Sequence, residues 1–278
     1  MKFPPIYIIK MPGSERNLEL YSSLKKLGLD YQIQDAVVGK NLSSSEINLR
    51  VNLRSCDARL GYRISNNLIG SGLSHREIYK KVFDAKSDWV LVLEEDAILA
   101  DFISTELSEI INLCGSEPTI VQLFSRAARL MDKKSIKKLK NSSRIIFDFK
   151  PRIAGCGAPG YLINRSAIEM ALSNDKLAGA PDWPEWAQKV SMKGIFPWMI
   201  TESDIGSTMP NMPISQSKYL SRRLLQFTGI HFLIYRKEYK SFWEYFKEEI
   251  TPYILHVRWK VGGSKYYLGD PAAPQIVR

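Results

Sequence analysis

Three consecutive carboxylates at the end of an apolar run are the residues of this sequence best suited to chemistry. Glu94, Glu95 and Asp96 follow the run WVLVL at 89–93, which predicts a fully buried strand. In open α/β sheets, ligands bind at the carboxyl ends of strands. Carboxylate oxygens suit Mg²⁺ or Mn²⁺, which can in turn hold a diphosphate. The alternative interpretation is a solvated strand end that has no ligand.

Side chains alternate along an extended strand, so we expect Glu94 and Asp96 to share one side and Glu95 to point to the other.

His75 lies within a helix-start pattern, the sequence SHRE at 74–77. Ser74 and Glu77 have the spacing of a capping box, which predicts a helix that starts at Ser74 and runs to about Ala85. His75 would then lie in the first helical turn, where the helix dipole and free N–H groups favour an anion such as a diphosphate. A structural histidine at the start of a helix is the alternative.

A glycine-rich stretch, GCGAPG at 155–160, has the spacing of a dinucleotide-binding fingerprint. That fingerprint must follow a strand and open a helix, whereas here Pro159 precedes the strand-like run at 161–163. We therefore expect a turn that feeds a strand near a ligand. Asp182 lies further on in GAPDWP. An acid in such a loop is either a site residue or an ordinary turn residue.

Other reaction classes lack their motifs. The three histidines show no HExxH spacing, and the three cysteines are too scattered for a zinc cluster or a disulfide scaffold. Neither a GxSxG elbow nor a GxxxxGK[ST] phosphate loop is present.

The elements that must position these residues follow an α/β pattern. A buried strand is predicted at 6–9, a helix from 18 to about 27 and a second strand at 31–38. Further strands are predicted at 120–124 and 161–163, followed by a helix at 166–172. Strand–helix–strand order predicts an α/β fold. Residues 39–70, polar and rich in Asn and Ser, have no pattern that assigns an element.

The composition of the 278 residues, 45% hydrophobic and 24% charged, is that of a globular protein. The first residues lack the apolar core of a signal peptide, and no run approaches the ~20 apolar residues of a membrane-spanning helix. These features predict a soluble, cytoplasmic protein.

The net charge of +10 is concentrated near the C-terminus. Residues 218–278 contain eleven Lys and Arg, five Asp and Glu, and 13 of the 30 aromatic residues. Apolar side chains recur there at helical spacing, at 239, 242, 243, 246 and 250. Such a stripe either packs on the domain, lies on an anionic membrane surface or binds nucleic acid. A second basic run, at 133–140, predicts a solvated helix face.

Taken together, these blocks resemble glycosyltransferase family 25, the bacterial lipooligosaccharide β-galactosyltransferases. Four blocks occur in family order over about residues 3–209: the strand that leads to Arg16, GSGLSH at 70–75, LEED at 93–96, and the turn and helix at 157–167 followed by Asp182. Glu95 stands where the family usually has Asp, Ser71 where Cys is common, and Asn67-Leu68 where Gly-Glu is common.

The resemblance implies a GT-A-like α/β fold with a mixed central sheet, formed by residues 1–217, and a basic, mainly helical extension at 218–278. It implies transfer of a hexose, most often galactose from UDP-galactose, to a lipopolysaccharide or lipooligosaccharide acceptor, assisted by Mn²⁺ or Mg²⁺. There are two alternatives. The enzyme could use another UDP-sugar, such as UDP-glucose, or the protein could be a non-catalytic one that binds membrane or nucleic acid.

By the same resemblance, Asp96 and Glu94 would hold the metal, with Glu94 also counted among the catalytic groups. Asp182 would lie near the acceptor or the metal. Because transfer needs a carboxylate that takes the proton of the acceptor hydroxyl, we expect Asp182 to be either the general base or an acceptor-side ligand. The donor-binding residues would be Arg16, Ser74, His75, Glu95, Gly157 and Tyr161. We expect no nucleic-acid partner. Composition adds one expectation, which is peripheral contact of the basic extension with the inner face of the cytoplasmic membrane.

Overall fold

The computed structural model describes most of the first 203 residues and two short segments beyond them. The described residues are 3–15, 18–60, 63–99, 103–124, 133–140, 142–149, 159–179, 185–203, 230–235 and 241–246. Three predicted site residues, Arg16, Gly157 and Asp182, lie outside this set, and so does the predicted domain boundary after residue 217.

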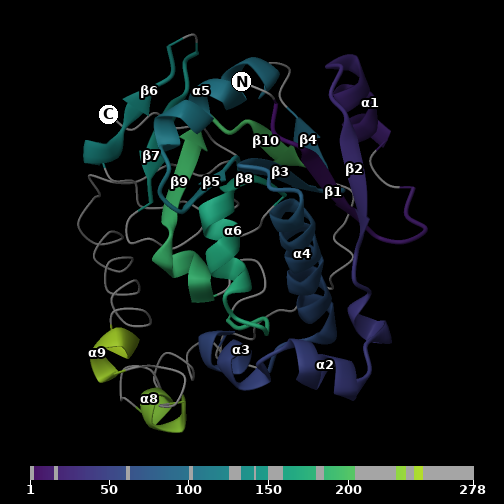
Figure 1. Ribbon diagram of the computed structural model, residues 1–278, viewed down its shortest axis with the longest axis vertical. Helices are drawn as coiled ribbons and strands as arrows, with labels where there is room; N and C mark the ends of the chain where they lie inside the picture. The colour runs from purple at the N-terminus through teal and green to yellow at the C-terminus, as the bar shows by residue number, and fades with distance from the viewer. Residues whose placement is uncertain are drawn as a thin grey trace.

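The described chain contains both helices and strands, and four helical segments in a row separate β2 from β3 (Figure 1). In chain order, the first elements are β1 (Ile6–Lys10), α1 (Leu18–Lys26), β2 (Tyr31–Asp35), η1 (Gly39–Asn41), α2 (Ser44–Arg50), α3 (Leu53–Leu60), α4 (Asn66–Asp84), β3 (Trp89–Glu94), β4 (Ala97–Leu99), α5 (Ile103–Cys114) and β5 (Thr119–Gln122). The later elements are η2 (Lys133–Ser135), β6 (Lys137–Lys138), β7 (Ile145–Asp148), β8 (Gly160–Asn164), α6 (Arg165–Leu172), η3 (Glu185–Lys189), β9 (Ser191–Phe196), β10 (Ile200–Glu202), α8 (Ile230–Tyr235) and α9 (Phe242–Tyr245).

Eight of the described strands form one mixed sheet, in the order β2-β1-β3-β8-β5-β9-β7-β6. β1 is parallel to β2 and β3, whereas β8 is antiparallel to both of its neighbours. Lys10 pairs with Asp35, Ile9 with Glu94, and Leu93 with Gly160. The strands β1, β2 and β3 therefore end at one edge of the sheet, where β8 begins. We call it the carboxyl edge.

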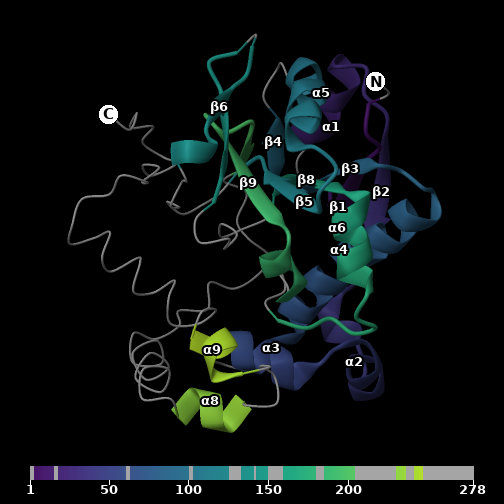
Figure 2. The same cartoon turned by 60° about the vertical axis from the view of Figure 1, so that its left-hand side comes forward.

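Helices cover both faces of this sheet, which confirms the predicted α/β fold with a mixed central sheet. Val90 and Val92 of β3 belong to a core shared with α4 and α6, whereas Leu91 and Leu93 belong to a core shared with α1 and α5. α4 and α6 lie alongside each other across the first face (Figures 1 and 2). The alternation along β3 therefore decides which helix layer each side chain meets.

The helix predicted to start at Ser74 starts eight residues earlier, so that prediction is wrong. α4 begins at Asn66, after the N-cap residue Ser65, whose hydroxyl accepts a hydrogen bond from the Leu68 N–H. Ser74 and His75 are therefore mid-helix residues, and the helix dipole gives no reason to place an anion at His75. The end of the helix, with Ala85 as the C-cap, is as predicted.

Gly70 and Gly39 allow α4 to pack closely against the segment that precedes it. A Cβ atom on Gly70 would lie 2.3 Å from the Val37 carbonyl oxygen, and one on Gly39 would lie 1.7 Å from the Asn66 carbonyl oxygen. The two backbones thus pack directly against each other. The Ser74 hydroxyl donates to the Gly70 carbonyl (2.7 Å) and accepts from the Val37 N–H (2.8 Å), which fastens the helix to this segment.

Residues 39–70, which the sequence leaves unassigned, form η1, α2, α3 and the start of α4. Their apolar side chains make a separate small core with Leu73 and Leu177. α2 begins with a true capping box, in which Ser43 and Glu46 bond each other's backbone N–H groups.

The other strands and helices predicted within the described residues are present at or near the predicted positions, except in one place. The strands at 6–9, 31–38, 89–93, 120–124 and 161–163 are present as β1, β2, β3, β5 and β8, and the two predicted helices are α1 and α6. The basic run at 133–140 is mostly exposed but does not form the predicted α-helix. It forms η2 and the edge strand β6, whose two lysines are exposed.

Two helical turns, α8 and α9, come from the basic extension. α8 contacts α3, where Arg54 donates a hydrogen bond to the Ile234 carbonyl oxygen. Tyr245 is buried against Phe232 and Phe246, whereas Phe242 and Trp243 are mostly exposed. No helix among the described residues is long and apolar enough to cross a membrane.

Candidate functional site

Glu94 is the last residue of β3 and lies at the carboxyl edge. Its N–H donates to the carbonyl oxygen of Pro159 (2.9 Å), the residue that precedes β8. The backbone of β3 is therefore hydrogen-bonded to this neighbouring segment up to its last residue. The side chain of Glu94, 31% exposed, extends to the α4 face, where Oε1 lies 3.3 Å from His75 Nε2. A partly open carboxylate is thereby held against a buried imidazole.

His75 is fixed from its other side by two buried tyrosines. Its Nδ1 lies 2.8 Å from the Tyr161 hydroxyl, and that hydroxyl lies 2.7 Å from the Tyr79 hydroxyl. Tyr161 comes from β8, opposite Val92 of β3, and Tyr79 comes from α4. The Glu94–His75–Tyr161–Tyr79 chain thus runs from the carboxyl edge into the core between α4 and the sheet.

The direction of the hydrogen bonds in this chain follows from the donors available. A neutral imidazole carries its proton on one ring nitrogen. Nε2 lies 3.3 Å from Glu94 Oε1 but makes no hydrogen bond within the described residues, and a proton on Nε2 leaves Nδ1 as an acceptor. Nδ1 then accepts from Tyr161, and Tyr161 accepts from Tyr79. Burial raises the pKa of Tyr79 well above its ordinary value, so this last phenol stays protonated and serves as the donor.

Glu95, the first residue after β3, has its side chain on the opposite side of the sheet from that of Glu94, as predicted. Its Oε2 accepts a hydrogen bond from the Met11 N–H (3.3 Å), at the start of the loop that follows β1. Burial and the charge of Glu95 together raise the pKa of Tyr21, which places the Tyr21 phenol of α1 near this carboxylate. Glu94 therefore serves the α4 face of the sheet and Glu95 the α1 face.

Asp96 lies in the turn between β3 and β4. Its carbonyl oxygen accepts a hydrogen bond from the Ser203 N–H (2.8 Å), next to the pairing of β4 with β10. Its carboxylate oxygen Oδ1 is shielded from solvent. Because β3 ends at Glu94, strand alternation does not extend to Asp96, and the turn sets its direction instead.

The other predicted donor-binding residues fall into two groups. Ser74 is fully buried, and its two hydrogen bonds described above go to backbone atoms. Arg16 and Gly157 lie outside the described residues, as does the proposed base Asp182. The structure therefore brings Glu94, His75 and Tyr161 together, and a direct contact of Ser74 or Arg16 with a donor stays a prediction.

Tyr79 and Tyr21 are the neighbours of the site that the sequence analysis did not select. Tyr79 had a usable signal, because it lies four residues after His75 and residues at that spacing share a helix face. Tyr21 had none, since its proximity to Glu95 depends on how α1 packs over the sheet.

The sequence model of glycosyltransferase family 25, described as LPS biosynthesis proteins, matches residues 3–176 of this chain. The match spans more than half of the polypeptide and includes all four of the contacting residues Glu94, His75, Tyr161 and Tyr79. This protein belongs to glycosyltransferase family 25. No curated protein sequence gives a significant match.

Three of the solved structures that are similar to this chain show low sequence identity and low TM-scores. A197 from STIV shares 13% identity over 71% of this chain and 83% of its own, with a TM-score of 0.39. A glycosyltransferase involved in glycosylation of the major capsid of PBCV-1 shares 9% sequence identity. The similarity covers 61% of this chain and 65% of that protein, with a TM-score of 0.28. A CMP:2-keto-3-deoxy-manno-octonic acid synthetase complexed with CTP shares 10% sequence identity. The similarity covers 82% of this chain and 87% of that protein, with a TM-score of 0.32. Likeness at this level says nothing of the substrate of this chain.

Proposed function

We propose that this family 25 glycosyltransferase moves a hexose, namely galactose from UDP-galactose, onto a lipopolysaccharide or lipooligosaccharide acceptor. The observation that carries the proposal is the contact between Glu94 Oε1 and His75 Nε2 (3.3 Å) at the carboxyl edge. Ligands of open α/β sheets bind at this edge. A positioned, partly exposed carboxylate there is suited to a donor diphosphate and its cation.

A divalent cation fits the chemistry of these residues. Among the described residues, no three His, Cys, Asp or Glu side chains gather into a metal cage. Mg²⁺ bound to a diphosphate does not require one, since one or two protein carboxylates and the phosphate oxygens complete its shell. Asp96 and Glu94 are the two carboxylates we assign to Mn²⁺ or Mg²⁺. The cation would neutralise the charge that builds on the leaving diphosphate.

The protein's own residues supply the remaining roles. His75 lies against Glu94, with Nε2 3.3 Å from Oε1 but without a hydrogen bond between them, and Tyr161 and Tyr79 hold the imidazole in place from its Nδ1 side. Asp182 would accept the proton of the attacking acceptor hydroxyl, which is the role of a general base. Arg16 and Gly157 would contact the donor diphosphate.

A second part of the proposal concerns where the acceptor is met. α8 and α9 expose Leu233, Ile234, Phe242 and Trp243, and residues 218–278 carry an excess of six positive charges. Exposed apolar side chains beside basic ones suit an anionic membrane surface, where each Lys or Arg contributes about 1 kcal/mol. We propose peripheral contact with the cytoplasmic membrane face, where a glycolipid acceptor is presented. Sedimentation with anionic vesicles at low and high salt tests it, and the absence of binding at low salt would refute it.

The experiment that tests the proposed reaction is a screen of UDP-sugars for UDP release, with and without Mn²⁺. We expect metal-dependent release that is fastest with UDP-galactose. Fastest release from UDP-glucose would keep the reaction class and change the sugar. A lack of release from every UDP-sugar would favour the non-catalytic binding protein.

A further inference from the structure

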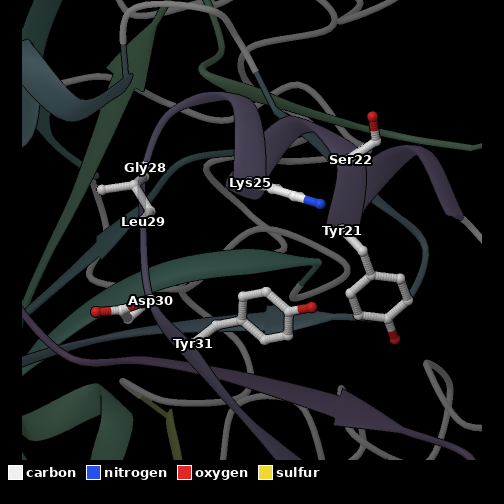
Figure 3. Close-up of a pocket in the computed structure, with 7 residues that line it drawn as sticks. All are labelled: Tyr21, Ser22, Lys25, Gly28, Leu29, Asp30 and Tyr31. Carbon is white, nitrogen blue, oxygen red and sulfur yellow. The ribbon is translucent and has the colours of Figure 1, made fainter.

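A pocket of about 570 Å³ lies between α1 and β2, on the α1 face of the sheet (Figure 3). Its volume is within the range of about 300–1,000 Å³ that small-molecule sites occupy. One wall comes from α1, and the other comes from the turn that begins at Gly28 and leads into β2. Gly28 has a positive φ of 66°, so the chain turns there without a side chain that would fill the space.

Two tyrosines form the aromatic part of this pocket. The rings of Tyr21 and Tyr31 are 5.7 Å apart between centroids and inclined by 34°. Lys10 at the end of β1 places its Nζ 5.7 Å from the Tyr21 ring centroid, which helps to hold that ring. Tyr31 is 38% exposed, so part of its ring is open to a ligand.

Tyr21 connects the pocket to the carboxyl edge. Its hydroxyl is shielded from solvent and makes no hydrogen bond within the described part of the chain. The charge of Glu95 is one of the causes that raise the pKa of Tyr21, so the phenol remains a protonated donor near the acidic strand end. A buried hydroxyl without a partner is unusual in a folded protein. Tyr21 therefore lies between the pocket and Glu95, on the α1 face of the sheet.

The rim of the pocket offers both donors and acceptors. Ser22, Lys25 and Asp30 line it along with the two tyrosines, and Figure 3 shows Lys25 on the helix above the Tyr21 and Tyr31 rings. One positive and one negative side chain give the rim no net charge. An aromatic wall with a neutral, hydrogen-bonding rim matches a sugar ring, which has apolar C–H faces and a border of hydroxyl groups.

We propose that this pocket binds a sugar unit of the acceptor glycan, an inference that rests on the proposed transfer reaction. A nucleoside base fits less well for two reasons. Tyr21 and Tyr31 contact each other, so a flat base cannot lie between them. Moreover, Gly28 to Asp30 precede β2 and Tyr31 is its first residue, so this wall lies at the amino end of the strand rather than at the carboxyl end, where nucleotides bind in such sheets.

Ligand-observed saturation-transfer NMR tests the pocket directly, with lactose, cellobiose and maltose as probes. We expect the wild-type protein to transfer saturation to at least one disaccharide and Tyr31→Ala to lose most of that signal. Ile33→Ala is the matched control, because Ile33 is 41% exposed on the same edge strand and does not line the pocket. The control should bind as the wild type does, and added UDP should not displace the sugar.

Steady-state kinetics provide a second test of the pocket. Tyr31→Ala should raise the KM for the acceptor about tenfold and leave the KM for the UDP-sugar unchanged. The pocket assignment would be overturned if none of the three disaccharides bound the wild-type protein. It would also be overturned if Ile33→Ala lost as much of the saturation-transfer signal as Tyr31→Ala, or if UDP displaced the sugar. Calorimetry with UDP separates the two proposals. Protein that binds UDP but no disaccharide refutes the pocket alone, whereas Tyr31-dependent sugar binding without UDP binding refutes the proposed reaction.

Discussion

His75 Nε2 lies 3.3 Å from Glu94 Oε1, although the two residues belong to different layers of the fold. His75 is in the middle of α4, and Glu94 is the last residue of β3. The imidazole is 5% exposed and the carboxylate 31%. A buried group therefore positions an accessible one, which is how supporting residues commonly serve a ligand-binding carboxylate.

His75→Ala should lower the turnover of UDP-sugar by about 10–100-fold, the usual effect of losing a group that orients a metal-binding carboxylate. His75→Gln should restore part of the rate, since a Gln amide can donate to Glu94. Steady-state kinetics of the two variants, with circular dichroism to verify folding, make the comparison. Equal rates for His75→Ala and the wild type would leave His75 a purely structural residue.

Tyr161→Phe should destabilise the protein more than Tyr79→Phe does. Removal of the Tyr161 hydroxyl deprives both His75 Nδ1 and the Tyr79 hydroxyl of a partner, at about 1–3 kcal/mol for each buried group. Removal of the Tyr79 hydroxyl deprives only Tyr161. Urea denaturation measures both free energies of unfolding. The reverse order would contradict the hydrogen-bond chain.

Gly70→Ala should destabilise the protein by about 1–3 kcal/mol or more, because its Cβ would meet the Val37 carbonyl oxygen at 2.3 Å. Gly28→Ala is the matched control. It introduces strain through its positive φ but meets no atom within 4 Å, so a loss of about 1 kcal/mol is expected. Thermal unfolding of the two variants compares them. Similar losses would mean that α4 can shift away from residue 37.

The start of α4 illustrates what the sequence could not predict. Ser74 and Glu77 have the same spacing as Ser43 and Glu46, and only the second pair forms a capping box. In the first pair, the Ser74 hydroxyl bonds the Val37 N–H instead, and Glu77 pairs with Arg50. Both partners are distant in the sequence, so local spacing could not distinguish the two cases.

The strands were predictable for the opposite reason. β1, β3 and β8 are buried on both faces, and their short apolar runs carry that signal locally. Glu94 could be selected because it follows such a run. Its contact with His75 depends on how α4 packs across the sheet, which only the three-dimensional structure gives.

Asp182→Asn should reduce kcat by at least about 100-fold and change the KM for the UDP-sugar little, because a general base acts chiefly in the transition state. Initial rates over a range of donor concentrations separate the two parameters. A variant that instead loses donor binding would move Asp182 to the metal side of the site. Normal turnover would remove Asp182 from the reaction.

The most direct test of the proposed reaction is UDP release from UDP-galactose by the wild-type protein and by Asp96→Ala, each with and without Mn²⁺. Glu95→Asp, the residue more common in the family, is the matched control on the other side of β3. We predict Mn²⁺-dependent release by the wild type and by Glu95→Asp, and none above background by folded Asp96→Ala. Normal Mn²⁺-dependent turnover by Asp96→Ala would contradict the metal-assisted site at the end of β3.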